Sequence, residues 1–516
     1  MSRRWRRLRR SILASPTPRP DHHPETIVAP AGSLSSGLAV EVPARPLTIS
    51  KGTPVSFELT LIAGLIALAS LLLSRRTSNP DTFFRGHSEQ GTAPGLWTLV
   101  FSQVTTWIFA RSLLNAAILG YYYGIWGTLA YALYYLSFIT GGIIIDQLRF
   151  RHGFNSIQAF LEDRFGNWGS RCYNLVIGVR LISEVFANLL VIGILFGAVG
   201  SQLYTAAIIG FAAVTLLYSM LGGLHASLRT DLLQMLVFIA TLALLIGLAT
   251  HSGVLSLDNL LFKEFQISDP GPVLMLVALL QVWSYPMHDP VMMDRGLLAD
   301  RPTTRKSFLH AAWISILCIL AFGSLGIVAG AQAQSGEAMT DALQRLLGDL
   351  PMLLFNAALV ISAMSTLDST LSSSSKLVII DMKLLPTRVS NGRGVMLLFM
   401  LLGVWLVFVG NKDLFSAVAV SGTASMYLLP VIFFSLLGGR RDIPLWSYLG
   451  SFALALAGAA LYFTESSGYS QLMGDAHKYS KLLLICLVVL VGGCTLFALG
   501  VVTGARQRLA NEGSPA

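Results

Sequence analysis

The stretch that decides the fold is AMSTLDSTLSSSSK, residues 363–376, which lies inside an otherwise apolar segment. In hydrocarbon, a polar side chain costs free energy unless a partner satisfies it, so this cluster must face a neighbouring helix, a cavity or an ion. For any single hydroxyl, close helix packing is an alternative explanation, because Ser and Thr let helices approach each other. The cluster as a whole holds more oxygen atoms than packing requires. The stretch therefore predicts a small-cation site within a membrane-spanning helix.

The composition indicates a polytopic membrane protein. Hydrophobic residues make up 54% of the chain, charged residues only 12%, and the mean hydropathy is +0.65. A soluble domain carries about 25% charged residues. Apolar runs recur, each near the roughly 20 residues that cross a bilayer. We predict an all-α protein with about thirteen transmembrane helices, near residues 57–74, 97–124, 126–146, 170–198, 203–221, 230–250, 271–290, 307–332, 351–377, 394–410, 413–437, 444–463 and 481–504.

The domain organisation follows from the same pattern. Residues 1–54, rich in Pro, Ser and Ala, predict a disordered basic tail. Residues 55–505 form the predicted transmembrane domain, and residues 506–516 a short cytoplasmic tail. The sequence shows no Walker loop or Rossmann fingerprint, so we expect no bound nucleotide. We read the net charge of +9 as a consequence of topology and expect no nucleic-acid partner.

Lys and Arg concentrate in alternate connections between the spans. One set holds clusters, as in residues 75–85 and 295–306, whereas the other holds single residues such as Lys263 and Arg345. The positive-inside rule then predicts the cytoplasmic membrane, with the N-terminus outside and the C-terminus inside. The basic start MSRRWRRLRR would lie outside, more than 40 residues before the first span and beyond the range of the rule. A start codon placed too early, or an added targeting segment, would also explain it.

Two spans carry residues that a bilayer excludes. Residues 283–290 include Pro286 and Pro290 on either side of His288 and Asp289, and each proline disrupts a helix. A polar run also occupies the middle of the span at residues 97–124, where it consists of Ser102, Gln103, Thr105, Thr106, Arg111, Ser112 and Asn115. Two interrupted helices, five spans apart, are the pattern of secondary transporters built from inverted repeats. The alternative is that the prolines only kink a continuous helix.

These features resemble the sodium:solute symporter family, the relatives of bacterial proline, pantothenate and galactose symporters. The resemblance covers about residues 80–440. Three segments carry it: LGGLHASLRTDLLQ at 221–234, Asp289-Pro290 with the basic stretch that follows it, and 363–381, where a Ser-Thr pair, a Ser-rich turn and a later Asp occur in the family's order. The resemblance implies the five-plus-five inverted-repeat fold of the leucine transporter, with two broken helices and a core at about 95–440.

The resemblance also implies a site for a sodium ion between the first broken core helix and the eighth core helix. A dehydrated sodium ion takes about five hard oxygen ligands. The implied ligands are the carbonyls of Phe101, Val104 and Ser362 and the hydroxyls of Ser365 and Thr366. The last three residues share one helical face, since they lie at i, i+3 and i+4.

Asp231 lies near the predicted cytoplasmic end of its span. We expect it either to guide the exiting ion or to cap the next helix.

The predicted solute pocket departs from the family pattern. Some relatives carry an Asp at the position of Gln103 and a Gln at that of Asp289. A guanidinium such as that of Arg111 suits a carboxylate, although Glu184 or Asp289 would also neutralise it. Glu184 has a second candidate partner in Arg180, one helical turn earlier. The predicted solute-binding residues are Gln103, Arg111, Trp283, Tyr285 and Asp289.

The sequence therefore predicts a sodium-coupled symporter, not an enzyme, that imports a small polar solute by alternating access. An organic acid or an amino acid is favoured over a sugar. Its partners are the solute and the lipid bilayer, and its oligomeric state stays open. Three alternatives remain: a transporter-like sensor, which the short C-terminal tail disfavours; a membrane-embedded enzyme, which the short loops disfavour; and a proton-coupled carrier that uses His288 and Asp289.

Overall fold

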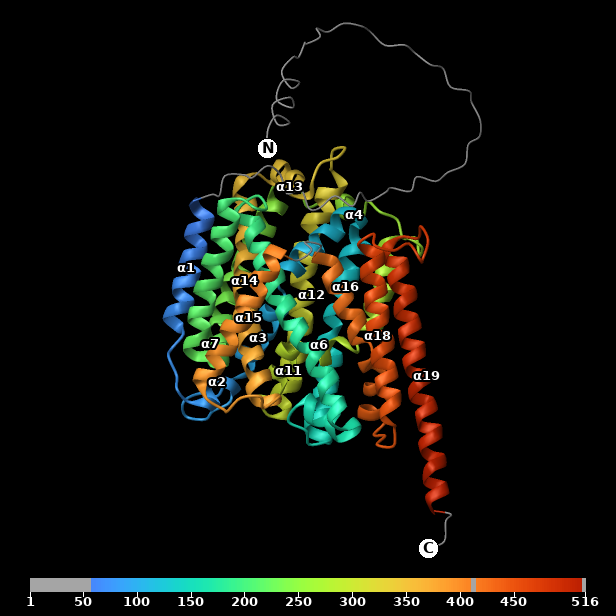
Figure 1. The fold of residues 1–516 in the computed structure, drawn as a ribbon. Coiled ribbons are helices and arrows are strands. Elements are labelled where there is room, and N and C mark those ends of the chain that lie inside the picture. Colours follow the sequence, from blue (N-terminus) through green and yellow to red (C-terminus); the bar gives the residue numbers. More distant parts are fainter. Residues whose placement is uncertain (1–56, 410–413, 513–516) are drawn as a thin grey trace, which may run out of the picture. The chain divides into compact units, whose positions relative to one another are not determined.

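The computed structural model describes the backbone of residues 57–409 and 414–512, and the side chains of residues 57–409 and 420–504. Every regular element in these ranges is a helix, as Figure 1 shows. The predicted tail at 1–54 lies outside the described residues. At the other end, α19 continues to Glu512, beyond the predicted end of the last span.

The helices run in the following order. The first half comprises α1 (Phe57–Leu73), α2 (Pro80–Arg85), α3 (Leu96–Trp107), α4 (Ala110–Leu133), η1 (Tyr134–Leu136), α5 (Ser137–Ile145), η2 (Asp146–Arg151), α6 (Ile157–Phe196), α7 (Gln202–His251) and α8 (Leu257–Leu260). The second half comprises α9 (Pro270–Gln281), α10 (Tyr285–His288), α11 (Pro290–Gly296), α12 (Arg301–Ala331), α13 (Met339–Leu347), α14 (Asp349–Lys376), η3 (Leu377–Asp381), α15 (Val389–Val409), α16 (Leu414–Ser425), α17 (Leu428–Pro430), η4 (Val431–Leu437), α18 (Leu445–Ser466) and α19 (Lys478–Glu512).

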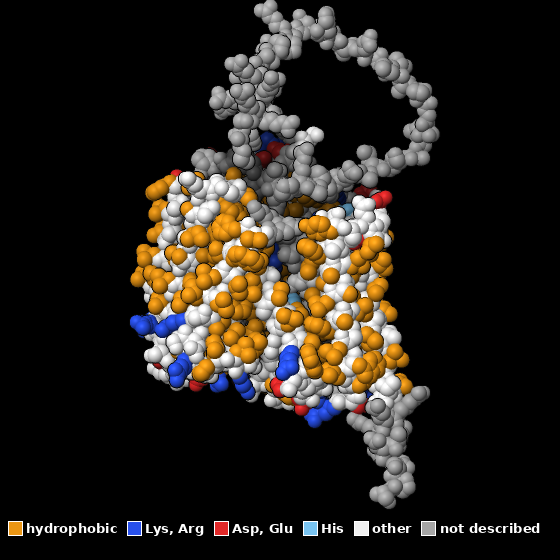
Figure 2. Space-filling model, in the orientation of Figure 1, with side chains coloured by type: hydrophobic (Ala, Val, Ile, Leu, Met, Phe, Trp, Pro, Cys, Tyr) orange, Lys and Arg blue, Asp and Glu red, His pale blue; other side chains and the backbone are white. Residues whose placement is uncertain are grey.

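The described helices are suited to a bilayer. Eight of them, some with a π-helical continuation, are long and apolar enough to cross it, and three shorter apolar helices accompany them. In Figure 2 apolar side chains cover the flank of the helical body, while Lys and Arg side chains gather along one edge. The number of thirteen spans stays a prediction, because the helix boundaries differ from the predicted spans. In α7, for example, two predicted spans join at Gly223, whose φ of +57° a residue with a side chain rarely adopts.

Two helices are broken, as the sequence predicts. The first break separates α3 from α4 at Ile108 (φ −82°, ψ 61°) and Phe109, which is extended (φ −68°, ψ 159°). The second separates α10 from α11 at Asp289 (φ −108°, ψ 96°). Pro290 opens α11, where its missing N–H costs no helical hydrogen bond, and the Asp289 side chain caps that helix by accepting from the Met292 N–H at 2.9 Å.

Small residues let α12 lie directly against α4. Gly326 faces the carbonyl of Ala117, and Gly330 faces that of Tyr121, so closely that a Cβ at either glycine would overlap the opposing backbone. Helices in a bilayer gain little from the hydrophobic effect between them, and close backbone contact supplies van der Waals attraction instead. This contact fixes α4, and with it the first helix break, against α12.

Candidate functional site

The first helix break faces the serine-rich part of α14. The Ser362 hydroxyl donates a hydrogen bond to the carbonyl of Ile108, which lies in the break itself. Thr366 Oγ1 donates to the Ser362 carbonyl at 3.0 Å. A small cavity of about 10 Å³ lies here, lined by Thr105, Ile108, Met235, Phe238, Ile361 and Ser362. A space of this size holds about one water molecule or one small ion.

Two predicted sodium ligands, the carbonyls of Phe101 and Val104, accept hydrogen bonds within α3 and each keep a second lone pair, so their role stays a prediction. The Phe101 carbonyl accepts from Thr105 Oγ1 at 2.8 Å, and the Val104 carbonyl accepts from the Ile108 N–H at 2.9 Å. Both carbonyls therefore belong to the hydrogen bonding of α3 and lie before the break. The hydroxyl of Thr106 also bonds back within the helix, to the Ser102 carbonyl at 2.7 Å, and α3 continues to Trp107. The residues of α3 and the break that reach the cavity are Thr105 and Ile108.

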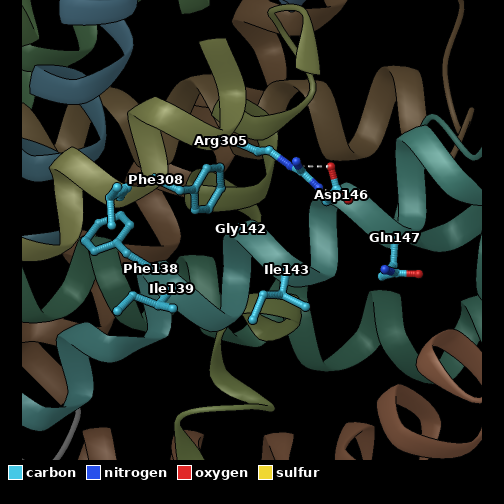
Figure 3. Close-up of a pocket in the computed structure, with 9 residues that line it drawn as sticks. Phe138, Ile139, Gly142, Ile143, Asp146, Gln147, Arg305 and Phe308 are labelled. Atoms are coloured by element: carbon cyan, nitrogen blue, oxygen red, sulfur yellow. Dashed lines mark hydrogen bonds and ion pairs between the residues drawn. The ribbon is translucent and has the colours of Figure 1, made fainter. Parts of the chain in front are cut away.

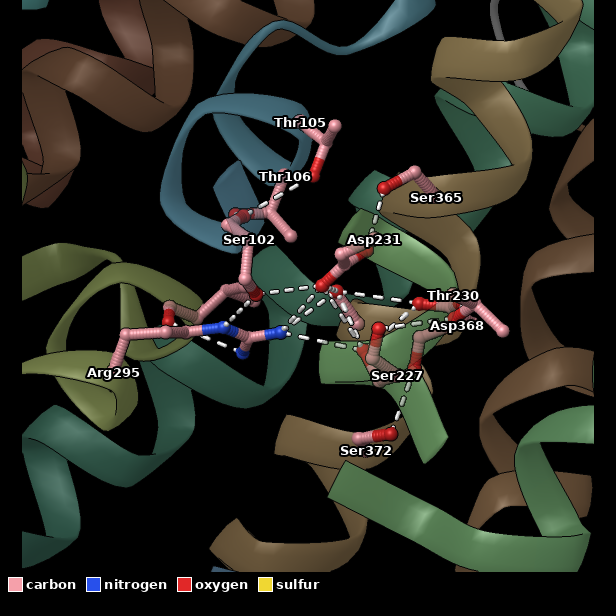
Figure 4. Close-up of polar contacts among 12 residues, drawn as sticks. Ser102, Thr105, Thr106, Ser227, Thr230, Asp231, Arg295, Ser365, Asp368 and Ser372 are labelled. Carbon is pink, nitrogen blue, oxygen red and sulfur yellow. Dashed lines mark hydrogen bonds and ion pairs between the residues drawn. The ribbon is translucent and has the colours of Figure 1, made fainter. Parts of the chain in front are cut away.

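Asp231 of α7 is the centre of a fully buried polar network (Figure 4). Its Oδ1 accepts from Ser365 of α14 at 2.6 Å, and its Oδ2 accepts from Ser102 of α3 at 2.6 Å. Arg295 of α11 places its Nη2 3.6 Å from the same Oδ2. The Asp231 carboxylate thus contacts α3, which is one half of the first broken helix, and α11, which is one half of the second. The prediction that Asp231 caps a helix is wrong, because Asp231 lies in the interior of α7.

A second buried carboxylate completes this network. Asp368 of α14 accepts from Thr230 Oγ1 at 2.8 Å and from Ser227 Oγ at 2.9 Å. Among the described side chains, no Lys or Arg nitrogen forms an ion pair with Asp368. Arg295 pairs with Asp231, whereas Asp368 is buried with hydroxyl partners, in a region without solvent exposure. Because burying an unpaired charge is very costly, we expect Asp368 to be neutralised, either by a bound proton or by a nearby cation.

Arg180 of α6 organises the second helix break. Its Nη2 lies 2.6 Å from Asp289 Oδ2 and 3.3 Å from Glu184 Oε2. The indole N–H of Trp107 donates to Asp289 Oδ2 at 2.8 Å, and the Arg180 guanidinium also lies over the Tyr285 ring, 5.0 Å from its centroid. Asp289 therefore connects the end of α3 to the beginning of α11.

Several polar atoms around the two breaks are buried without a partner. Buried polar groups in proteins are nearly always hydrogen-bonded to protein or to ordered water, so those without a protein partner mark positions where water or a solute can bind. Within the described residues, the atoms of this kind near the breaks are both amide atoms of Gln103, Arg111 Nε, Asn115 Nδ2, Glu184 Oε1 and His288 Nδ1. These atoms belong to a guanidinium, a carboxylate, two amides and an imidazole.

The predicted solute-binding residues fall into two groups. Tyr285 and Asp289 lie at the Arg180 cluster, whereas Trp283 packs its half-buried ring against Phe433 of η4, with centroids 5.4 Å apart. Gln103 and Arg111 lie on either side of the first break, and Arg111 stacks its guanidinium 5.3 Å from the Phe109 ring. Among the described side chains, Asp289 and Glu184 form ion pairs with Arg180 and not with Arg111, so neutralisation of Arg111 by either carboxylate stays an alternative.

The structure adds functional candidates that the sequence analysis did not select: Trp107, Ser227, Thr230, Arg295 and Asp368. Asp368 carried a signal of its own, because an acidic residue in the middle of an apolar helix has a functional role by default. Trp107 carried no such signal, since its contact with Asp289 joins residues 182 positions apart.

A third ionic cluster lies where α14 ends. Lys376 Nζ is 2.8 Å from Asp294 of α11 and 2.9 Å from Asp381 of η3. Asp294 and Arg295 are neighbours on α11, so α11 is attached to α14 by one residue and to α7 by the next. Any movement of α11 must break or carry both ion pairs.

A body of apolar helices with two broken helices around a buried polar centre defines a secondary membrane transporter. The comparisons agree with this class. A family model described as the sodium:solute symporter family matches residues 91–440 of the chain. The chain belongs to the sodium:solute symporter family, and its coupling ion is sodium.

Two solved transporter structures resemble the chain at low sequence identity. A Na⁺-coupled sialic acid symporter in a substrate-bound, outward-open state superposes with a TM-score of 0.64 at 15% identity, covering 87% of this chain and 98% of that one. Mhp1, a nucleobase-cation-symport-1 family transporter in a closed conformation, gives a TM-score of 0.49 at 14% identity, with coverage of 82% and 95%. No curated protein sequence matches the chain. The first likeness places the chain in the leucine-transporter fold, with its inverted-repeat core.

Proposed function

We propose that the protein imports a small polar solute, an organic acid or an amino acid in preference to a sugar, together with sodium. The observation that carries the solute class is Arg111, which is buried and forms no ion pair with the nearby carboxylates of Glu184 and Asp289. A guanidinium binds a carboxylate through two parallel hydrogen bonds, and in a buried site such a pair is much stronger than in water.

We place the sodium ion between the first helix break and α14. Ser362 and Thr366 already lie at the break, where Thr105 and Ile108 line the small cavity. Carbonyl and hydroxyl oxygens are the ligands that a hard monovalent cation prefers, and broken helices supply carbonyls of this kind. Ser365 lies on the same face of α14 and connects this position to Asp231 through its 2.6 Å hydrogen bond.

The Asp231 network would connect a bound sodium ion to helices α3, α11 and α14 through hydrogen bonds and an ion pair. An ion at the break would draw on the hydroxyl of Ser365, and Ser365 is bonded to the carboxylate that Ser102 and Arg295 also contact. Sodium would therefore favour one arrangement of α3, α11 and α14 over another, which is what coupling by alternating access requires. We expect sodium to stabilise the state that binds solute well.

Uptake into proteoliposomes tests this proposal. Labelled carboxylates, amino acids and sugars would be offered with and without an inward sodium gradient. The wild type would be compared with Ser365→Ala/Thr366→Ala. The control is Ser374→Ala, because Ser374 lies on the same helix and bonds to its own backbone at Leu371 (2.8 Å). We expect sodium-driven uptake of a carboxylate-bearing solute in the wild type and the control, and its loss in the double variant.

Other outcomes would support the alternatives. Uptake that ignores sodium and follows a proton gradient would contradict the sodium position and favour a proton-coupled carrier. His288 is then the first residue to substitute, since its Nε2 lies 2.7 Å from Ser421 Oγ and its Nδ1 has no partner among the described residues. Solute binding without uptake would favour a sensor. Uptake of sugars alone would contradict the role given to Arg111.

A further inference from the structure

A groove on the flank of the helical body lies apart from the buried site. It runs between α5 with its π-helical continuation η2 on one side and α12 on the other, and its volume is about 340 Å³ (Figure 3). Volumes of this order are typical of small-molecule sites. The lining residues are Phe138, Ile139, Gly142, Ile143, Asp146, Gln147, Arg305, Phe308 and Leu309.

The walls of this groove are apolar and open to the bilayer. Ile139, Ile143 and Leu309 are 43%, 40% and 58% exposed, and each lies on a helix that is long and apolar enough to cross a membrane. Their exposed side chains would therefore face lipid. Phe138 and Phe308 form the floor, with ring centroids 6.3 Å apart. Such walls suit a hydrocarbon chain, and a water-soluble solute would find no polar partner along them.

One end of the groove is basic. Asp146 accepts bidentate hydrogen bonds from two arginines, at 2.7 and 2.8 Å from Arg301 and at 2.9 and 3.0 Å from Arg305. The carboxylate is buried, with 8% of its side chain exposed, whereas the two arginine side chains are 48% and 59% exposed. Two guanidiniums on one carboxylate leave an excess positive charge at this end, on side chains that Asp146 already holds in place.

We propose that this groove is a binding site for an anionic phospholipid, with the phosphate at Arg301 and Arg305 and an acyl chain along Ile139, Ile143 and Leu309. Arginine suits phosphate because its fork of N–H groups matches the phosphate oxygens, and its order is here imposed in advance by Asp146. Basic pockets between transmembrane helices that open to the bilayer are the expected sites for anionic lipid headgroups.

The position of the site connects it to the transport machinery. Arg149, one turn beyond Asp146 on η2, donates to the Gly296 carbonyl at 3.2 Å, at the end of α11. Arg301 and Arg305 open α12, directly after the loop that follows α11. A lipid held between η2 and α12 would therefore stabilise the segment that carries Asp294 and Arg295.

The test uses the full-length protein in a neutral detergent and measures its unfolding temperature and apparent lipid affinity. Phosphatidylglycerol, phosphatidylcholine and inorganic phosphate are titrated separately. The variants are Arg305→Gln, which removes one phosphate contact, and Ile143→Trp, which fills the groove and leaves the Asp146 cluster intact. The control is Arg441→Gln, at an exposed arginine outside the groove.

We expect phosphatidylglycerol to raise the unfolding temperature of the wild type and the control, and phosphatidylcholine and inorganic phosphate to have little effect. Arg305→Gln should weaken the apparent affinity about fivefold, as loss of one basic contact does. If Arg305→Gln does not fold, Ile143→Trp decides, and it should lose the response. An equal response to both lipids would overturn the proposal, as would an equal response to inorganic phosphate or an unchanged response in Ile143→Trp.

Discussion

Ser365 donates a 2.6 Å hydrogen bond to Asp231, although the two residues lie 134 positions apart on α14 and α7. The same carboxylate accepts from Ser102 of α3 and faces Arg295 of α11. A single side chain thus receives contacts from both broken helices and from the serine-rich helix. Under the proposed coupling, Asp231 is the residue through which a bound ion acts on α3, α11 and α14.

Replacing Asp231 by Asn should disable this link. The substitution keeps an oxygen that accepts from Ser365 but leaves the Arg295 guanidinium buried without its carboxylate, which costs about 3–5 kcal/mol. We expect a lower unfolding temperature and the loss of sodium-dependent uptake. Both are measured on the purified protein, the second in proteoliposomes.

A double variant separates the ion pair from other effects of the substitution. Asp231→Asn/Arg295→Gln removes both charges, so its loss of stability should be smaller than the sum of the two single losses. A strictly additive result would show that Asp231 and Arg295 do not interact energetically, and would contradict the role assigned to the network.

Arg180→Gln should be among the most damaging single substitutions in α6. It would leave Asp289 and Glu184 buried together without their shared cation, at a cost of about 3–5 kcal/mol. Arg171→Gln is the matched control, since Arg171 lies on the same helix, is exposed and stacks only on Trp168 among the contacts described for it. Thermal unfolding of both variants in one detergent is the measurement. Similar losses of stability would contradict the role of Arg180 as the shared counter-charge of Asp289 and Glu184.

The loop before α13 should respond to acid. Arg345 pairs with Glu337 at 2.8 Å and lowers the pKa of that carboxyl to about 2, from the usual value of about 4.3. Because the folded pKa is the lower one, the ion pair contributes its full stability above about pH 5 and loses it as the pH falls toward 2.

Hydrogen exchange of α13 as a function of pH would measure this response. Relative to intrinsic exchange at each pH, Glu337→Gln should show lower protection factors than the wild type at neutral pH, and should lack the acid-dependent loss of protection expected of the wild type. Glu264→Gln, at an exposed glutamate in another loop, is the control and should follow the wild type. An identical pH profile for Glu337→Gln and the wild type would be evidence against the pairing.

The contact between α4 and α12 should not tolerate a methyl group. A Cβ at Gly326 would overlap the Ala117 carbonyl, so Gly326→Ala must push the helices apart, and overpacking of this kind costs about 1–3 kcal/mol. At Gly210 of α7 a Cβ meets nothing within 4 Å, and Gly210→Ala should leave stability unchanged or slightly improved. The difference in unfolding temperature between the two variants is the readout, and equal values would argue against close packing.

The sequence by itself determined the membrane class, the two broken helices and the importance of the serine-rich stretch. These features are local. The length of an apolar segment predicts a membrane span, a proline within it predicts a helix break, and a run of hydroxyl side chains in it predicts a polar environment. The family resemblance rested on short motifs of the same kind, and the family model bears it out over residues 91–440.

The tertiary structure decided which polar groups meet. The first break falls at Ile108 and Phe109, where the local sequence places neither a proline nor a glycine. The pairing of Asp289 with Arg180, and of Asp231 with Ser365 and Arg295, joins residues more than 60 positions apart. Such partners depend on how whole helices pack. A charged residue in an apolar segment is predicted to be buried from the local sequence, but only the packing determines which residue is its counter-charge.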